Sequence, residues 1–384
     1  MPYLFHLGRE TEICIAELQS FYPNLKSFNV EKYGFALVEE DVNPGIIDHL
    51  GGTIKISKIV QELPKKMPVN FTEIIKKEIQ DIEKGEGKFI YGINVYPSQT
   101  NLLKKLLKAA KETLKAEDIS SRYLNQDAEN LSSAGSAHCQ DINVVFGEEK
   151  NYLTETIAVQ NIDAYSKRDY GRPKRDGLSG MLPPKLAQVM INLAKPKKGT
   201  IVIDPFCGSG TISQETILMG FDSTAYDISE KAVFDTKINI EWFKKEFQPK
   251  GNLLEISQKD ATKLTATDYT KFGKNIAIVT ESYLGPPQRH IPTPTEAQKT
   301  LDDLENIYLD FLKTEIPKGT TVVLAIPFFN LKPSPVILAS LIYKAEGLGY
   351  SIPALTQKGL FYARKNQIVG RMILIFKKEV PAKV

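Results

Sequence analysis

The chain has 384 residues, about two to three times the length of a typical single domain, so more than one core is expected. Hydrophobic residues make up 42% of the chain and charged residues 25%, which are ordinary globular values and exclude a disordered tail protein or a fibrous repeat. Forty-nine Lys and Arg against 46 Asp and Glu give a net charge of +3, too weak a field to identify a nucleic-acid binder. Any such site must come from local clustering.

Cysteine usage and hydropathy indicate the compartment. The three cysteines, Cys14, Cys139 and Cys207, lie far apart, leave one unpaired in any disulfide scheme and form no close Cys/His pair. The first apolar run is broken at Arg9 and Glu10, too early for a signal-peptide core, and no stretch reaches the roughly 18 apolar residues of a membrane span. We therefore expect a reduced, cytoplasmic chain with no metal and no membrane partner.

Residues 1–63 alternate between strand and helix patterns. Their apolar spacing predicts strands over 3–7, 28–39 and 53–60, with a helix over 11–21 and a short helix over 44–50. This alternation is typical of a small α+β sandwich. Two prolines between 64 and 68 interrupt the pattern and predict a domain boundary.

Residues 64–162 form the second predicted domain. Helices are expected over 71–83 and 101–114, and strands over 88–96, 120–123, 142–146 and 152–159. The second helix has leucines on one face and lysines at 104, 108, 111 and 115 on the other. This lysine row fits contact with a phosphate backbone, but a solvated helix face produces the same spacing and is the more common cause of it.

Residues 163–180 read as a basic linker. Five basic residues gather there: Lys167, Arg168, Arg172, Lys174 and Arg175. They are the local cluster that the net charge conceals, and we predict that they contact nucleic acid. From residue 181 to 384 helices and strands alternate, which predicts a parallel sheet with crossover helices.

The most specific motif lies at residues 200–219. A short apolar strand ends at Asp204, a turn contains Gly208, Ser209 and Gly210, and an apolar-periodic helix follows. This order lets the backbone approach a ligand and points helix N-terminal N–H groups at it. The turn lacks the Gly-Lys-Ser/Thr ending of a phosphate loop and the third glycine of the dinucleotide fingerprint.

Acidic residues end four successive predicted strands. Asp227 follows the strand 223–226, Asp260 follows the strand 254–258, and Glu281 follows the strand 276–280, in addition to Asp204. Ligands of open α/β sheets bind beyond the carboxyl ends of the strands, and a carboxylate placed like Asp227 accepts ribose hydroxyls. The pattern therefore predicts a site for an adenosine-containing cofactor.

Four segments of the chain resemble a known family of enzymes. The segment 204–211 is similar to the first motif of class I S-adenosylmethionine-dependent methyltransferases, in the variant typical of enzymes that modify exocyclic amines of bases. Residues 167–194 resemble the connector and leading helix of the tRNA guanosine-N2 methyltransferases of the position-ten type, which carry an RNA-binding THUMP domain. Residues 3–18 and 50–60 resemble the N-terminal ferredoxin-like unit of that family.

The resemblance covers essentially the whole chain and implies an α/β fold class. It implies a class I, Rossmann-like methyltransferase domain preceded by ferredoxin-like and THUMP α+β domains. The corresponding residues are 1–63 for the ferredoxin-like domain, 64–162 for the THUMP-like domain, 163–180 for the linker and 181–384 for the methyltransferase domain. The segments 360–364 and 369–376 fall where this fold has an antiparallel pair.

The resemblance also implies the roles of individual residues. The methionine part of S-adenosylmethionine is expected near Asp204, Phe206, Gly208 and Gly210, with its ribose on Asp227 and its adenine amino group on Asp260. The implied partner is RNA, with tRNA as the expected RNA, and the implied target is a guanosine N2 at the junction of the acceptor and D arms.

The catalytic tetrapeptide departs from the family pattern of Asp or Asn followed by Pro-Pro-Tyr. Here the fourth strand runs into Thr280-Glu281-Ser282-Tyr283-Leu284-Gly285. Methyl transfer needs a hydrogen-bond acceptor for the target amine and a flat side chain on which the base can stack. Glu281 and Tyr283 supply these two groups. If the family tetrapeptide is aligned with residues 281–284, which precede Gly285, Glu281 takes the acidic position and Leu284 the aromatic one. If it is aligned so that Tyr283 takes the aromatic position, Thr280 takes the acidic one. We prefer the first alignment because it keeps a carboxylate at the strand end.

Three functions are compatible with these residues. The first is transfer of a methyl group from S-adenosylmethionine to guanosine N2 in RNA. The second is a DNA amino-methyltransferase with the same first motif, and the third is an RNA-binding protein that has lost turnover through the altered tetrapeptide. Cys207 and Trp242 are interpreted as packing residues, and His290 as an exposed loop residue.

Overall fold

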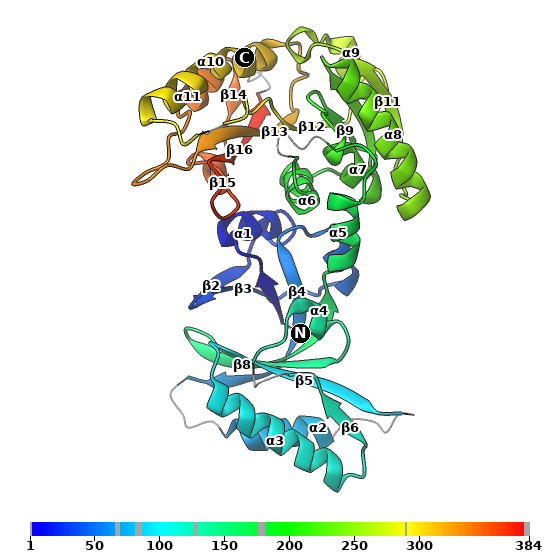
Figure 1. Ribbon diagram of the computed structural model, residues 1–384, viewed down its shortest axis with the longest axis vertical. Coiled ribbons are helices and arrows are strands. Elements are labelled where there is room, and N and C mark those ends of the chain that lie inside the picture. The colour runs from blue at the N-terminus through cyan, green and yellow to red at the C-terminus, as the bar shows by residue number, and fades with distance from the viewer. Residues whose placement is uncertain are drawn as a thin grey trace, which may run out of the picture. The chain divides into compact units, whose positions relative to one another are not determined.

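The computed structural model describes residues 2–65, 70–80, 87–125, 129–175, 181–288 and 290–379 (Figure 1). The chain divides into two compact units, Met1–Asp163 and Ala164–Val384. Each unit has its own sheet, in which eight strands are described. In the described ranges no helix combines the length and the apolar composition that a membrane span requires.

The sheet of the first unit is mixed. Its strands lie in the order β2 (Lys26–Val30), β3 (Tyr33–Val38), β1 (Tyr3–Leu7), β4 (Thr53–Pro64), β8 (Lys150–Val159), β7 (Gln140–Phe146), β5 (Phe89–Tyr96) and β6 (Ser121–Tyr123). β5 is parallel to β6 and β7, and the other pairs are antiparallel. Because β4 pairs with both β1 and β8, the sheet is continuous through residue 63. The division into 1–63 and 64–162 stays a prediction, and residues 66–69, next to that boundary, lie outside the described ranges.

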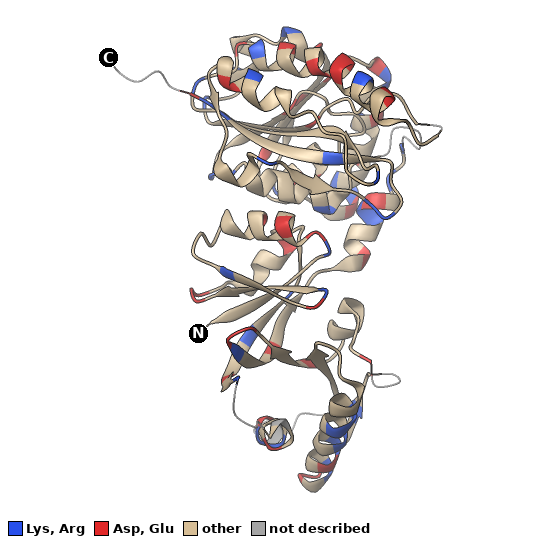
Figure 2. Cartoon of the chain, turned by 90° about the vertical axis from the view of Figure 1, so that its left-hand side faces the viewer, with Lys and Arg blue, Asp and Glu red and all other residues tan. Residues whose placement is uncertain are grey.

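Helices bury the apolar residues of this sheet. α1 (Thr11–Gln19) and the 3-10 helix η1 (Pro44–His49) join a core with β1, β3 and β4. α2 (Phe71–Gln80) and α3 (Thr100–Ala116) belong to a second core. There Leu103, Leu106 and Leu107 of α3 pack with Ile93 and Val144 of the sheet. The lysines of α3 are left on its exposed side, as Figure 2 shows in blue.

Two predicted segments differ from the structure. The single strand expected over 28–39 is the hairpin of β2 and β3, which turns at Glu31 and Lys32 and pairs Val30 with Tyr33. Glu31 has a φ of 53°, and the absence of Gly or Asn from the turn removed the usual sequence signal. The basic linker is helical over α5 (Ile162–Tyr170). Its last residues, 176–180, lie outside the described ranges.

The sheet of the second unit is parallel with an antiparallel edge. β11 (Leu253–Gln258), β10 (Asp222–Asp227), β9 (Ile201–Asp204), β12 (Ile276–Glu281) and β13 (Thr321–Phe329) are parallel neighbours in that order. β16 (Val369–Lys378) pairs antiparallel with β13, and β14 (Tyr350–Ser351) and β15 (Leu360–Tyr362) both pair with β16. The chain order reverses between β9 and β12, where the carboxyl ends of parallel strands form a ligand crevice.

Helices complete the second unit. α10 (Pro294–Lys313) and α11 (Ser340–Gly347) share a large core with the sheet, together with α9 (Ala266–Thr270) and the 3-10 helix η2 (Ala261–Lys263). α6 (Pro184–Leu193), α7 (Thr211–Leu218) and α8 (Glu230–Phe247) contact β13, β9 and β10. α10 begins with a capping box between Thr293 and Glu296, which satisfies its first N–H groups. The short elements α4 (Ser133–Ser136) and η3 (Ala354–Thr356) complete the list.

Candidate cofactor and acceptor site

The glycine-rich turn connects β9 to α7 and is held from behind by α8. Gly208 and Gly210 have φ values of 52° and 84°, in the left-handed region that side chains other than glycine rarely adopt. A Cβ on Gly210 would come within 2.6 Å of Cγ2 of Thr236, so this position also has no room for a side chain. The Thr236 hydroxyl donates to the Gly208 carbonyl at 2.8 Å. The turn therefore keeps a fixed shape, and the Gly210 N–H donates within it to the Cys207 carbonyl at 2.8 Å.

Asp227 ends β10 and faces this turn. One of its carboxylate oxygens accepts from the Gly208 N–H at 2.9 Å, and the other accepts from the Ser229 N–H at 2.9 Å. The side chain is half-buried and lies at the mouth of the crevice. The carboxylate is thus fixed in direction and retains lone pairs for a further donor, such as a ribose hydroxyl.

Asp260 follows β11 and is fixed in the same way. Its Oδ1 accepts from the N–H of Thr262 at 3.0 Å and from the Thr262 hydroxyl at 2.7 Å. These bonds, with the Thr262 hydroxyl contributing most, lower the pKa of Asp260. Asp260 is therefore a carboxylate at neutral pH, able to accept from an amino group.

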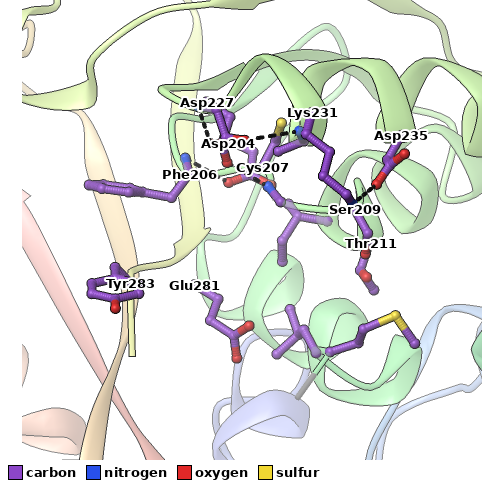
Figure 3. Close-up of a pocket in the computed structure, with 16 residues that line it drawn as sticks. Asp204, Phe206, Cys207, Ser209, Thr211, Asp227, Lys231, Asp235, Glu281 and Tyr283 are labelled. Carbon is purple, nitrogen blue, oxygen red and sulfur yellow. Dashed lines mark hydrogen bonds and ion pairs between the residues drawn. The ribbon is translucent and has the colours of Figure 1, made fainter. Parts of the chain in front are cut away.

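Two hollows adjoin one another at these strand ends. They have volumes of about 300 and 550 Å³ and share Phe206, Gly208, Asp227, Glu281 and Tyr283. The smaller one, drawn in Figure 3, adds Asp204, and the larger one adds Asp260 and Leu284. The structure thus brings the predicted cofactor residues to one crevice, except that Gly210 lines neither hollow.

Asp204 is buried under the turn. It is 1% exposed, and its Oδ1 accepts from the Thr280 hydroxyl at 2.6 Å and from the Phe206 N–H at 3.4 Å. Burial raises the pKa of Asp204 to about 7, although these two donors oppose the shift. Because the Thr280 hydroxyl is fully buried and donates to Asp204, Thr280 is poorly placed to accept from a substrate. This geometry favours Glu281 as the acceptor.

Glu281 ends β12 and forms an ion pair that the sequence did not indicate. Its Oε1 accepts from Nε of Arg371 at 2.7 Å, and Arg371 is 2% exposed. Burial raises the pKa of Glu281, while the charge and hydrogen bond of Arg371 oppose that shift. The two residues are 90 positions apart, and no local spacing connects them.

The loop after Glu281 is anchored on both sides. The N–H and hydroxyl of Ser282 both donate to the Ala325 carbonyl, at 3.0 and 2.9 Å. The Tyr308 hydroxyl donates to the Tyr283 carbonyl at 2.7 Å. Tyr283 is 52% exposed and its ring borders both hollows, so the side chain is accessible to a planar ligand. Gly285, with a φ of 88°, turns the chain away from the strand.

Two of the five basic residues of the linker are buried. Arg168 is 4% exposed and pairs with Glu215 at 2.8 Å. Arg172 is 3% exposed and donates to the Thr211 hydroxyl at 2.7 Å, at the start of α7. Both therefore attach the linker to the second unit, and their contact with RNA stays a prediction.

The other three basic residues are more accessible. Lys167 is exposed and pairs with Glu246. Lys174 is half-buried and Arg175 is exposed, with their cationic groups over the rings of Phe234 and Tyr170. Their contact with RNA stays a prediction.

Other candidates have structural environments. Burial raises the pKa of Cys207, and its Sγ lies 3.9 Å from the Thr236 hydroxyl. Trp242 packs against Phe243 and Phe247, and His290 is exposed. Within the described ranges, no group of three or more His, Cys, Asp or Glu residues could hold a metal ion.

One ion pair in the crevice was missed from the sequence. Asp235 and Lys231 pair along α8 at 2.5 Å and both line the smaller hollow. The signal was available, because an acid and a lysine four residues apart on the helix after Asp227 share one face. Met181 and Leu182, just before α6, also line this hollow and lie outside any motif.

Comparisons with known proteins agree with this geometry. Residues 172–281 match the family described as RMKL-like, methyltransferase domain. The tRNA (guanine(10)-N2)-dimethyltransferase of Methanocaldococcus jannaschii is 33% identical over 114 residues, which are 28% of this chain and 31% of that protein. The enzyme of the same name from Methanothermobacter thermautotrophicus is 28% identical over 189 residues, 49% of this chain and 51% of that protein. The chain thus spans about half or less of the length of these relatives.

One solved structure is similar over the whole chain. The crystal structure of TrmN from Thermus thermophilus superposes with a TM-score of 0.52 at 17% identity, covering 98% of this chain and 100% of that one. A likeness at this identity shows the fold. The predicted fold class is confirmed: an N-terminal sheet domain precedes a Rossmann-like methyltransferase sheet. The second unit therefore contains a methyltransferase domain that is distantly related to tRNA guanine-N2 methyltransferases.

Proposed function

We propose that this chain transfers a methyl group from S-adenosylmethionine to the exocyclic N2 amine of a guanosine in RNA, with tRNA as the RNA. One observation carries the proposal: the acceptor carboxylate of Glu281 and the accessible ring of Tyr283 border the same crevice as Asp227 and the glycine-rich turn. Cofactor and acceptor groups thus meet at the ends of β9, β10 and β12. The names of the two archaeal relatives support the choice of guanine N2.

The crevice suits S-adenosylmethionine in its donor and acceptor groups. The Asp227 carboxylate accepts ribose hydroxyls and Asp260 accepts the adenine amino group, while Phe206 offers an apolar surface to the methionine part. Asp204 and the turn surround the remaining end, where the methionine part belongs. When bound, the cofactor supplies an electrophilic methyl group on a positively charged sulfur.

Glu281 and Tyr283 act on the target base. The Tyr283 ring stacks on the guanine, and Glu281 accepts a hydrogen bond from the exocyclic N–H, which orients the nitrogen lone pair toward the methyl carbon. The new N–C bond forms as the C–S bond breaks with its electron pair going to sulfur, and the surplus proton on nitrogen is released to water. A base must leave its stack for this geometry, because a paired guanine cannot present its amine.

The first unit and the linker are the proposed RNA contacts. The exposed lysine row of α3, together with Lys167, Lys174 and Arg175, supplies positive charge for phosphates. Each exposed cation of this kind should add about one unit to the salt dependence of RNA binding. The Arg175→Ala variant should therefore weaken RNA binding without changing affinity for S-adenosylmethionine.

Methyl transfer from radiolabelled S-adenosylmethionine to total tRNA, followed by nuclease mapping of the labelled nucleotide, tests the proposal. Label in N2-methylguanosine is the expected result. Label in DNA and none in tRNA would replace it with the DNA amino-methyltransferase, and cofactor binding with no transfer to either would make the chain a non-catalytic binding protein.

The acceptor is tested by the Glu281→Gln variant. Turnover should fall about 100-fold, because the neutral amide is a weaker acceptor, while affinity for S-adenosylmethionine stays nearly unchanged. Glu305→Gln is the matched control: this glutamate is buried and, like Glu281, has a cationic partner, Lys344, but it borders neither hollow. Equal turnover of Glu281→Gln and wild type would move the acceptor to another group.

A further inference from the structure

Glu281 and Arg371 come from strands that are not neighbours. Glu281 ends β12 and Arg371 lies on β16, with β13 between them. Glu281 is opposite Ala325 on β13, and Arg371 is opposite Pro327, two residues further along the same strand. Side chains two residues apart on a strand share one face, so the guanidinium reaches Glu281 across β13 above Ala325.

Ala325 makes this crossing possible. Its side chain ends at the Cβ atom and is fully buried, so it leaves space above β13 that a longer side chain would fill. Its carbonyl is already engaged by Ser282, which fixes the chain immediately after Glu281. The strand end is thus held through the backbone while the carboxylate is held by Arg371.

Among the described residues, one carboxylate oxygen of Glu281 accepts a hydrogen bond. Oε1 is occupied by Arg371, and within the described ranges Arg371 is the hydrogen-bonding and ionic partner of Glu281. The side chain of Glu281 is 18% exposed and that of Arg371 2%, so Glu281 faces the opening and Arg371 lies behind it. Figure 3 shows the Glu281 carboxylate at the edge of the smaller hollow, on the side away from Asp227.

We infer that Arg371 is a positioning residue for methyl transfer, which holds Glu281 ionised through Oε1 and leaves Oε2 as the acceptor for the target amine. The inference rests on the proposed function. Glutamate has one more rotatable bond than the Asp or Asn expected at this place, and a misplacement of about 1 Å costs roughly 100-fold in rate. A buried guanidinium that fixes one oxygen removes this freedom. The pair also keeps the acceptor charged in a site where burial favours the neutral acid.

The test compares Arg371→Met, Arg371→Lys and the double variant Arg371→Met/Glu281→Gln with wild type. Arg371→Met should lower kcat about 10- to 100-fold at pH 7 and change the affinity for S-adenosylmethionine by less than about twofold. Its kcat should recover as the pH is raised, because Glu281 must then lose a proton that wild type has already lost. Arg371→Lys should recover part of kcat, since the charge returns without the planar fork. Arg364→Met removes an exposed arginine as the control.

The double variant guards against misfolding and tests coupling. It removes both charges, so it should fold even if Arg371→Met alone does not, and its kcat should be no lower than that of Glu281→Gln. Circular dichroism and the fluorescence of Trp242, the single tryptophan of the chain, report folding. Additive losses in kcat, or an Arg371→Met variant that folds and keeps wild-type kcat, would overturn the inference. Joint loss of cofactor affinity and kcat would likewise show a purely architectural role.

A spectroscopic measurement separates this inference from the proposed function. In the infrared difference spectrum of Arg371→Met minus wild type at pH 7, an additional carbonyl band of a protonated carboxyl group should appear, which the double variant minus wild type should lack. The band of Asp204, whose pKa is about 7, is common to all three proteins and cancels. Absence of the band would contradict the inference. If wild type transfers no methyl group to tRNA or DNA, the proposed function fails, whereas the band still decides whether Arg371 keeps Glu281 ionised.

Discussion

The carboxylate of a buried acid in the first unit and that of a strand-end acid in the second differ in how many of their oxygens accept hydrogen bonds from the protein. Asp141 of β7 is fully buried, and both of its oxygens accept from protein groups. Glu281 of β12 has one oxygen paired and faces a crevice. Both acids have a cationic partner, Lys55 in one case and Arg371 in the other.

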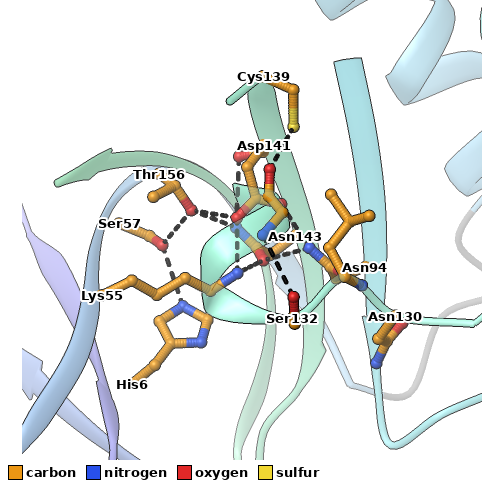
Figure 4. Close-up of polar contacts among 12 residues, drawn as sticks. His6, Lys55, Ser57, Asn94, Asn130, Ser132, Cys139, Asp141, Asn143 and Thr156 are labelled. Atoms are coloured by element: carbon orange, nitrogen blue, oxygen red, sulfur yellow. Dashed lines mark hydrogen bonds and ion pairs between the residues drawn. The ribbon is translucent and has the colours of Figure 1, made fainter. Parts of the chain in front are cut away.

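The network around Asp141 is closed, as Figure 4 shows. Its Oδ2 accepts from the Lys55 ammonium at 2.6 Å and from the Thr156 hydroxyl at 2.7 Å, while Oδ1 accepts from Asn94. Lys55 also donates to Asn143 at 2.7 Å. These residues come from β4, β5, β7 and β8, so the network crosses the middle of the sheet.

The difference separates structural acids from those available to a ligand. A buried charge with every oxygen occupied cannot bind a ligand without losing a partner, so removing it should affect folding. A carboxylate with a vacant lone pair at a crevice is available to a ligand, so removing it should affect binding or rate. Each acid lies beside a cationic side chain, so neither the residue type nor the presence of such a partner distinguishes them.

Asp141→Ala should have the largest effect on stability. It leaves the Lys55 ammonium buried without its partner, which costs about 3–5 kcal/mol of the free energy of unfolding. Chemical denaturation followed by circular dichroism measures this loss. Glu62→Ala, which breaks the exposed pair with Lys150, is the control and should cost much less, because solvent screens exposed charges. Equal losses in the two variants would contradict the assignment of Asp141 as a closed structural acid.

The strand-end acids were accessible to sequence reasoning because parallel strands place their carboxyl ends at one edge. That rule placed Asp204, Asp227 and Glu281 at one crevice before the structure was known. Arg371 was not predictable, because its contact depends on the register of β16 on β13 and on the small side chain of Ala325. Long-range register leaves no local trace in the sequence.

The fold shows the same limit. Alternating patterns predicted most strands, since each buries one face, whereas the pairing of β4 with β8 joins residues about a hundred positions apart. The prediction that the basic residues of the linker contact nucleic acid was based on their charge alone. Its guanidinium groups at Arg168 and Arg172 turn inward because Glu215 and Thr211 offer partners there, which composition cannot show.

Asp227→Ala should lower affinity for S-adenosylmethionine about 10- to 100-fold. The variant loses the ribose acceptor, and charged hydrogen bonds are worth about 1.5–3 kcal/mol. It also releases the Gly208 N–H that Asp227 now holds. Titration calorimetry measures the affinity, with Asp222→Ala as the control because Asp222 begins the same strand at its far end. Unchanged affinity of Asp227→Ala would mean that the ribose binds elsewhere.

Asp204→Asn should change the free energy of unfolding least at low pH, and the change should grow as the pH rises. The folded-state pKa of Asp204 is about 7, raised by burial above its ordinary value of 3.8. The folded state therefore holds a proton that the unfolded state has released between these two values, and wild-type stability declines as pH rises through 7. Asparagine keeps the acceptor for the Thr280 hydroxyl and does not titrate.

Between pH 5 and pH 7 the free energy of unfolding of wild type should fall relative to that of Asp204→Asn by about 1.4 kcal/mol per pH unit, because the unfolded wild type has already released the proton that the folded protein keeps. By pH 8 the variant should be the more stable of the two. Denaturation followed by Trp242 fluorescence, which reports on the second unit, measures both proteins at each pH. Parallel stability curves would mean that Asp204 is ionised in the folded protein throughout, as expected of an open carboxylate like Asp227 and not of a buried one.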